Sequence, residues 1–208
     1  MNTSQSAGAP AKFGADVIRV HDGFLEEDQQ KAVLAHLLAP GWGYGAYSDP
    51  SPGASRYWYK HFAGYLRDGK EIHTASGIEE ELSAASEIVF AVWLKLKSGP
   101  LSGHLLTRCY ANGYPSGAEG GVHLDSNVPD HFTAIYYPQL SWHPNYAGET
   151  AFFNADGSDL IFSAYPKPNR LVIFPGTVPH VARAVSRACP ELRVTLMFKT
   201  AVLRFPTA

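Results

Sequence analysis

A histidine and a carboxylate two residues apart are the first feature of this chain with the chemistry of a metal site. His123 and Asp125 lie in the run GGVHLDSN. On a strand, residues i and i+2 project to the same face, so the imidazole and the carboxylate can converge on one metal ion. The chain has nine histidines. Such a pair therefore arises readily by chance, and it indicates a site only if a third ligand joins it.

The best third ligand is His180, which follows a strand-like run and a Pro-Gly turn in the segment VIFPGTVPHVA. Two histidines and one carboxylate on one face of a metal ion leave three coordination positions open. This arrangement is typical of non-haem Fe(II) oxygenases. The alternative is a purely structural β-domain in which His123 and His180 are hydrogen-bonded polar residues without a ligand role.

Short strands are the elements that would position these residues. After residue 103 the chain consists of β-forming runs with turn signals between them, which favours a closed or two-sheet β architecture. The eight runs are His104–Ala111, Gly121–Leu124, Phe132–Tyr137, Thr150–Phe153, Leu160–Phe162, Leu171–Phe174, His180–Val185 and Arg193–Lys199.

Two helices are expected before this β-region. Residues Leu25–Leu38 form a helical pattern with an acidic start that suits the helix dipole, and an apolar stripe of helical period runs from Ile78 to Leu96. No linker separates helices from strands. We therefore predict one α+β domain, mainly β, over residues 16–208, with N-terminal helices that buttress a catalytic β-core at about 104–200. The small polar residues 1–15 are expected to form a flexible tail.

The composition excludes several classes of partner. The net charge of −2 and the pI of about 6.5 provide no basic field for a nucleic acid or an anionic membrane. Two cysteines are too few for a disulfide framework, and neither belongs to a CxxC pair, which disfavours a zinc site. The N-terminal residues lack the apolar core of a secretory signal, and no apolar run is long enough for a membrane span. The expectation is a soluble cytoplasmic protein.

From Leu105 to Lys199 the chain resembles the catalytic core of the Fe(II)/2-oxoglutarate-dependent dioxygenases, most closely the prolyl-hydroxylase-like group. The segments that carry this resemblance are TRCYANGY, GGVHLDSN, TAIYYPQLSWHPNYAGETAFF, NRLVIFPGTVPHVARAV and RVTLMFK. The resemblance implies a double-stranded β-helix of jelly-roll type. It also implies Fe(II) held by His123, Asp125 and His180, and 2-oxoglutarate and O2 as co-substrates, with release of succinate and CO2. Because the carboxylate ligand is present, hydroxylation or another oxygenase outcome is favoured over halogenation.

The distal carboxylate of 2-oxoglutarate needs a cationic partner, and a guanidinium can hold a carboxylate with two parallel hydrogen bonds. Arg193, with Thr195 on the same face of the last strand, matches the family's Arg-x-Ser/Thr element. Arg183 would point to the opposite side of its strand from His180, and Arg187 lies in a polar connection. The resemblance further implies that Tyr137 and Tyr110 contact the co-substrate.

Substrate contacts are expected from two places. Arg108 and Asn112 flank Tyr110 and can reach a substrate. Residues 41–65 contain eight aromatic residues among glycines, and we expect them to form a mobile cover on the substrate side of the pocket. The alternative is that these aromatic residues belong to edge strands packed on the helices. The contacts expected from this segment are Arg56, Tyr57, Tyr59 and Lys60.

The preferred substrate is a small metabolite or natural-product intermediate, oxidised at a C–H bond, with a peptide or protein side chain as the second possibility. The fold class alone does not choose between them. A different class of function, a cupin-like isomerase or sugar-binding module in the same type of barrel, would need neither 2-oxoglutarate nor Arg193.

Overall fold

The computed structural model describes residues 14–48, 55–64, 66–67, 70–71 and 77–203 of the chain. Almost all of the expected tail, 1–15, lies outside these residues. Among the residues described, no helix combines the length and apolar character required to cross a membrane.

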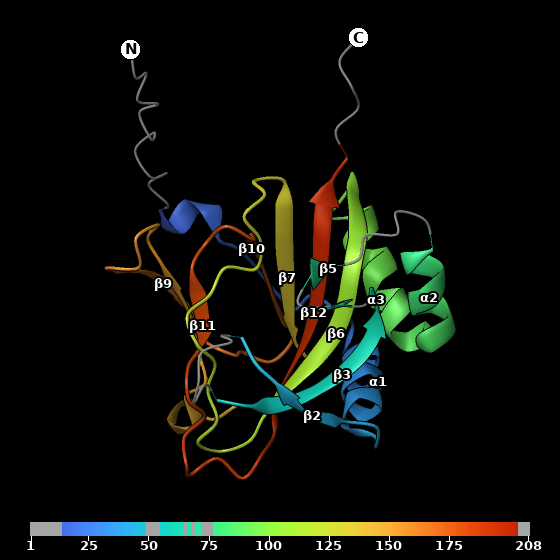
Figure 1. Cartoon of the computed structure of the whole chain (residues 1–208). Helices are drawn as coiled ribbons and strands as arrows, with labels where there is room; N and C mark the ends of the chain where they lie inside the picture. Colours follow the sequence, from blue (N-terminus) through green and yellow to red (C-terminus); the bar gives the residue numbers. More distant parts are fainter. Residues whose placement is uncertain (1–13, 49–54, 65, 68–69, 72–76, 204–208) are drawn as a thin grey trace, which may run out of the picture.

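A seven-stranded antiparallel sheet forms the larger layer of the molecule (Figure 1). Its strands, in spatial order, are β1 (Arg19–Asp22), β10 (Arg170–Pro175), β7 (His131–Tyr137), β12 (Arg193–Val202), β6 (His104–Tyr114), β3 (Tyr57–Ala63) and β2 (Gly43–Ala46). A second, three-stranded antiparallel sheet faces it. It consists of β11 (His180–Ala182), β8 (Thr150–Phe153) and β9 (Leu160–Ala164).

The smaller elements lie between or beside these sheets. They are the two-stranded ribbon of β4 (Leu66–Arg67) and β5 (Lys70–Glu71) and the 3-10 turns η1 (Ala15–Val17) and η2 (Pro144–Tyr146). The prediction of a mainly β fold with two sheets is confirmed.

Three helices pack on the face of the large sheet that is turned away from the small sheet, as Figure 1 shows. They are α1 (Glu27–Leu38), α2 (Ile78–Ala85) and α3 (Glu87–Ser98). The single helix expected from Ile78 to Leu96 is therefore wrong. Ser86 interrupts it in an extended conformation, with φ −164° and ψ 108°, and its hydroxyl accepts a hydrogen bond from the Val89 amide as the N-cap of α3.

Successive side chains of β12 point alternately to the two faces of the large sheet, one packed against the helices and the other lining the site. Val194, Leu196 and Phe198 are buried against the helices. The odd-numbered residues of β12 point to the other side, between the two sheets, and include Arg193 and Thr195. The strand thus supplies core and site residues from one ten-residue segment.

Two strand predictions need correction. Residues 121–124 do not form a strand, because only His123 makes a ladder contact there, as an isolated bridge with His180. The strand expected over 180–185 ends at Ala182. Within the expected cover, 41–65, β2 and β3 are paired strands of the large sheet, and residues 49–54 lie outside the described chain.

Candidate metal centre

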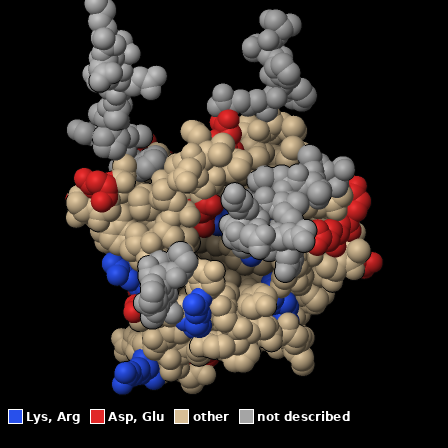
Figure 2. Space-filling view, in the orientation of Figure 1, with Lys and Arg blue, Asp and Glu red and all other residues tan. Residues whose placement is uncertain are grey.

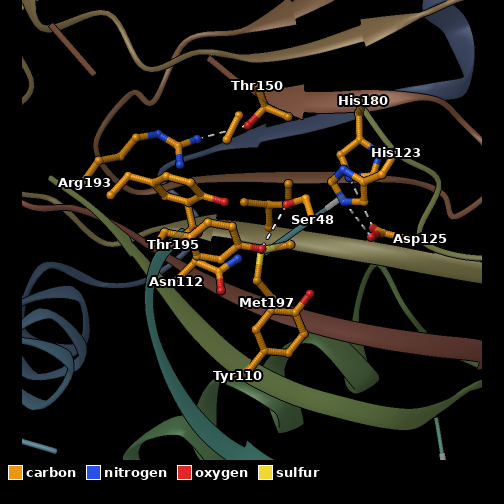
Figure 3. Close-up of a pocket in the computed structure, with 14 residues that line it drawn as sticks. Ser48, Tyr110, Asn112, His123, Asp125, Thr150, His180, Arg193, Thr195 and Met197 are labelled. Carbon is orange, nitrogen blue, oxygen red and sulfur yellow. Dashed lines mark hydrogen bonds and ion pairs between the residues drawn. The ribbon is translucent and has the colours of Figure 1, made fainter. Parts of the chain in front are cut away.

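His123, Asp125 and His180 meet between the two sheets, as Figure 3 shows, with one ligand atom of each within 4.8 Å of the others. The Nε2 atom of His123 lies 3.4 Å from Asp125 Oδ1, and that of His180 lies 3.4 Å from Oδ2. The two histidines are held side by side by reciprocal backbone hydrogen bonds of 3.1 Å. This isolated bridge positions His123, which we had expected a longer strand to do.

The same local device fixes both imidazole rings. His123 Nδ1 lies 2.9 Å from the Gly121 carbonyl oxygen, and His180 Nδ1 lies 2.9 Å from that of Val178. Because a carbonyl oxygen only accepts, each Nδ1 donates a proton to it, and each Nε2 is turned toward Asp125. Burial lowers the pKa of His180 to about 4, so this ring is neutral near pH 7. Both rings therefore direct Nε2 to the place where a metal ion would bind.

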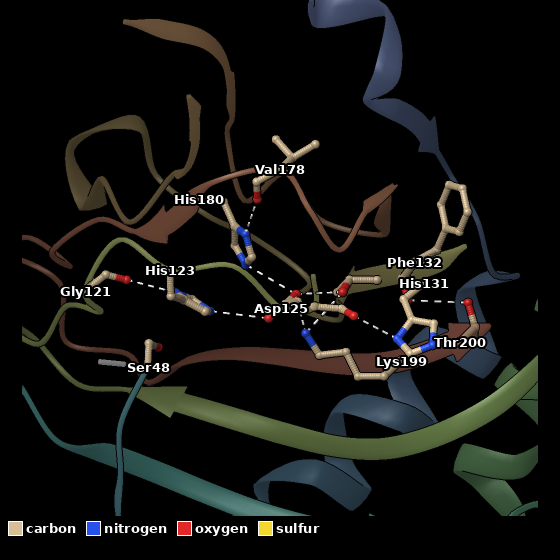
Figure 4. A network of polar contacts seen from close by, with 12 residues as sticks. Ser48, Gly121, His123, Asp125, His131, Phe132, Val178, His180, Lys199 and Thr200 are labelled. Atoms are coloured by element: carbon tan, nitrogen blue, oxygen red, sulfur yellow. Dashed lines mark hydrogen bonds and ion pairs between the residues drawn. The ribbon is translucent and has the colours of Figure 1, made fainter. Parts of the chain in front are cut away.

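Asp125 is a buried carboxylate supported by two residues of the large sheet (Figure 4). Its Oδ2 accepts a hydrogen bond of 2.6 Å from the Thr133 hydroxyl and forms an ion pair with the Lys199 ammonium. Burial is the largest single effect and would raise the pKa of Asp125, but Lys199, His180 and His123 together outweigh it, and the pKa lies well below its ordinary value. The carboxylate is therefore ionised at neutral pH.

A pocket of about 410 Å³, including space open to solvent, begins at this centre and continues between the sheets. The described residues that line it are Ser48, Tyr57, Tyr110, Asn112, Tyr114, His123, Asp125, Ile135, Thr150, His180, Ala182, Arg193, Thr195 and Met197.

Arg193 is the cation at the other end of this pocket, and it is only 1% exposed. Its Nη2 donates to Thr150 Oγ1 at 3.1 Å, while Nε and Nη1 have no hydrogen-bond partner within the described chain. Burying unpaired charged donors is costly, so the site is suited to an anionic ligand. Gly148 allows this placement because a Cβ there would lie 2.9 Å from Arg193 Cδ.

The remaining predicted co-substrate residues fall into two groups. Thr195 and Tyr110 line the pocket. Tyr137 is not among the lining residues, but its hydroxyl lies 2.7 Å from Thr150 Oγ1 and its ring packs beside Arg193. Tyr137 therefore touches the same hydroxyl as the guanidinium.

The predicted substrate residues are more dispersed. Asn112 and Tyr57 line the pocket, whereas the others are absent from its described lining. Arg108 stacks on Tyr110, with 4.2 Å between its guanidinium carbon and the ring centre. Lys60 donates to backbone carbonyls at the end of α1.

Two further residues of this group lie at the surface. Arg56 is exposed and stacks on Tyr47, and Tyr59 is 41% exposed. The two rejected arginines, Arg183 and Arg187, are also exposed.

Several residues of the site were not anticipated from the sequence. The alternation of strand residues could have indicated five of them. Lys199 and Met197 share a strand face with Arg193, Thr133 and Ile135 share one with Tyr137, and Tyr114 shares one with Tyr110. The loop residue Ser48 and the small-sheet residue Thr150 carried no comparable local signal. The unanticipated residues are Ser48, Tyr114, Thr133, Ile135, Thr150, Met197 and Lys199.

The donor set fits a first-row transition metal. Two imidazole nitrogens and one ionised carboxylate converge on a pocket that includes space open to solvent, and two histidines with one carboxylate are the ligand set of the non-haem iron site. The carbonyl partners of the two rings supply the outer support that such ligands usually have.

No family model matches the chain, and no curated protein matches its sequence. Several solved structures are similar to it. A Pseudomonas putida prolyl-4-hydroxylase has a TM-score of 0.59 at 20% identity, over 91% of this chain and 94% of that one. HygX from Streptomyces hygroscopicus, with nickel and 2-oxoglutarate bound, has a TM-score of 0.62 at 12% identity, over 92% and 85% of the two chains.

A prolyl hydroxylase from Trichoplax adhaerens, in complex with a hypoxia-inducible-factor peptide, has a TM-score of 0.58 at 17% identity, over 89% and 84% of the chains. These similarities extend over nearly the whole chain. They show that this protein has the jelly-roll fold of the 2OG-Fe(II) oxygenases.

Proposed function

We propose that this protein is an Fe(II)- and 2-oxoglutarate-dependent oxygenase that hydroxylates a C–H bond of its substrate. The observation that carries the proposal is that one pocket holds both a His-Asp-His ligand set and a buried arginine, Arg193, with two nitrogens that have no hydrogen-bond partner in the described chain. The fold and the ligands bound to the similar HygX structure support it.

Fe(II) would be held by His123 Nε2, His180 Nε2 and the Asp125 carboxylate. When bound, the metal together with 2-oxoglutarate and O2 supplies the oxidising chemistry, with succinate and CO2 as products. The protein directs both Nε2 atoms to the centre and keeps Asp125 ionised, so the carboxylate needs no proton loss before it binds a metal.

Arg193 would bind the distal carboxylate of 2-oxoglutarate through its free Nε and Nη1. Thr150 fixes the guanidinium by accepting from Nη2, and Tyr137 contacts the same Thr150 hydroxyl. Thr195, on the pocket face of the same strand, would assist. This arrangement orients the co-substrate with its other end toward the metal ligands.

The substrate side of the pocket offers hydroxyl and amide groups rather than charges. Ser48, Tyr57, Asn112 and Tyr114 line it, and the apolar side chains of Ile135 and Met197 limit the access of water near the centre. We therefore infer a neutral, polar small metabolite or natural-product intermediate. The structure of HygX with hygromycin B bound supports a small-molecule ligand on this fold.

A peptide or protein side chain is the second candidate substrate. Val122 and Leu124, which flank His123, are 52% and 45% exposed and form an apolar rim beside the ligands. An extended chain can pack against such a rim. The prolyl hydroxylases of the same fold support this alternative.

The test is succinate formation with Fe(II) and 2-oxoglutarate, screened over small molecules and peptides. We expect His123→Ala, Asp125→Ala and His180→Ala each to abolish turnover and metal-dependent thermal stabilisation, because each removes one of three ligands. The matched control, His21→Ala, changes an exposed histidine of β1 and leaves both unchanged. Full metal stabilisation in a folded His180→Ala variant would contradict the ligand set, and no succinate with any substrate would favour a cupin-like function.

A further inference from the structure

Lys199 places a buried positive charge directly against the carboxylate of the candidate metal centre. The residue is 6% exposed, and its ammonium contacts Asp125 Oδ2 as well as Thr133 Oγ1, the latter at 3.1 Å. Thr133 in turn donates to the same Oδ2. Figure 4 shows this network on the side of Asp125 that faces the large sheet.

This network leaves the two carboxylate oxygens in different situations. Oδ1 faces His123 Nε2 at 3.4 Å, whereas Oδ2 is engaged by Lys199 and Thr133 and also lies 3.4 Å from His180 Nε2. Lys199 therefore holds one oxygen of Asp125 and leaves the other without a cationic partner in the described chain. Lys199 acts on the metal centre through Asp125: it positions the carboxylate, and it also adds a positive charge beside it.

The charge balance of the pocket follows from three residues. With neutral histidines, a His-Asp-His set has a charge of −1, but here Lys199 cancels it. Arg193 adds one positive charge at the other end of the pocket. The described charged groups at the pocket therefore sum to +1, which is an unfavourable environment for a divalent cation on its own.

We propose that Lys199 makes the binding of the divalent metal and of the dianionic 2-oxo acid strongly interdependent. This inference rests on the proposed function, since it concerns the same pocket. A cation that enters a positive pocket is weakly held, and a dicarboxylate then supplies the negative charge that the protein withholds. Each ligand therefore raises the affinity for the other, and the coupling is reciprocal.

The experiment measures the Kd of Mn²⁺ by titration calorimetry, with and without saturating 2-oxoglutarate. The ratio of the two values is the coupling factor. In Lys199→Met, we expect Mn²⁺ alone to bind at least about tenfold more tightly and the coupling factor to fall at least about tenfold. The reason is that a neighbouring unit positive charge repels a divalent cation, and even in bulk water this repulsion weakens binding by about tenfold. Lys199→Arg, which keeps the charge, should retain the wild-type coupling.

The matched control is Lys167→Met, which removes a lysine from an exposed ion pair with Asp22 and should change neither value. Lys199→Gln removes the charge but keeps a hydrogen-bond donor, and it serves the same test if the methionine variant does not fold. Unchanged or weaker Mn²⁺ binding in the uncharged variants would overturn the inference. A wild-type protein that binds no Mn²⁺ with or without 2-oxoglutarate would instead contradict the proposed function.

Discussion

At the scale of single residues, Arg193 is notable because most of its hydrogen-bonding capacity is unused. It is almost fully buried, yet only Nη2 has a described partner, Thr150. A buried cation without partners destabilises a folded protein, and its removal is often neutral or stabilising. The residue is therefore better explained by a ligand than by the stability of the fold.

We expect Arg193→Met to raise the KM for 2-oxoglutarate by tens- to thousands-fold, because loss of the charged partner of a buried carboxylate costs about 2–5 kcal/mol. The unfolding temperature of the ligand-free protein should not fall, since the variant buries fewer unpaired donors. Initial rates of succinate formation and thermal unfolding measure the two quantities.

Arg183→Met is the control, since Arg183 is exposed and stacks on Phe153 outside the pocket. Its KM should match the wild-type value. An unchanged KM in Arg193→Met, or a larger rise in Arg183→Met, would assign the distal carboxylate to another residue.

The histidine ligands show how little regular structure a metal site requires. Each ring is oriented by the carbonyl oxygen two residues earlier, at Gly121 and Val178. The local chain around each histidine therefore sets its tautomer. The residues of the HxD pair lie close to His180 in the structure, although the strand expected around His123 is absent from it.

At the scale of elements, the edge strand β1 is joined to β10 by an ion-pair cluster. Asp22 lies 2.7 Å from Arg170 Nε and 2.8 Å from Lys167 Nζ. The hydrogen bond from Arg170 is the main cause that lowers the pKa of Asp22 from 3.8 to about 2. Because the folded-state pKa is depressed, the cluster stabilises the protein above pH 4, and this contribution is lost as the pH falls through about 2.

We expect Asp22→Asn to lower the free energy of unfolding by about 0.5–1 kcal/mol at pH 7, a value reduced for solvent screening because the Asp22 side chain is 39% exposed. The difference from wild type should shrink between pH 4 and pH 2. Urea unfolding across this pH range measures it, with Glu119→Gln, an exposed loop carboxylate, as the control. A difference that stays constant down to pH 2 would show that the ion pairs are not its cause.

The helices illustrate a limit of periodicity. The apolar stripe from Ile78 to Leu96 continues through Ser86, so the repeat gives no sign of the break there. Ser86 ends α2 and caps α3, and its hydroxyl also lies 2.9 Å from His36 Nε2 on α1. The break between α2 and α3 thus coincides with a contact between Ser86 and His36, which are 50 residues apart in the sequence. The local sequence pattern gives no information about this contact.

At the scale of the whole molecule, the sequence was most informative where alternation and ligand chemistry agree. Most strands of the β-core followed from residue type and spacing. The family resemblance added the expectation that His123, Asp125, His180 and Arg193 share one site, and the structure places them at one pocket. The further partners of these residues were not predicted, because Thr150 comes from the small sheet and Lys199 from the large one. Whether residues of the two sheets come into contact depends on how the sheets pack against each other, and this packing cannot be predicted from a short segment of sequence.

Segment 41–65 is a second example in which local sequence did not predict the tertiary arrangement. Its aromatic content suggested a cover, yet β3 is bonded on both sides, to β2 and to β6. Tyr57 still reaches the pocket, while Trp58 and Tyr59 are partly exposed. A role of residues 41–65 as a cover remains a prediction.

The last prediction concerns the two sheets as a unit. His180 belongs to the small sheet and Arg193 to the large one, so bound Mn²⁺ and 2-oxoglutarate should hold the sheets together. Ligand at 100 times its Kd stabilises a folded unit by about 2.7 kcal/mol. Hydrogen exchange in β8 and β11 should therefore slow by at least about tenfold, and Asp125→Ala should show no such slowing. Slowing confined to β2 and β3 would instead show that the ligands do not hold the two sheets together.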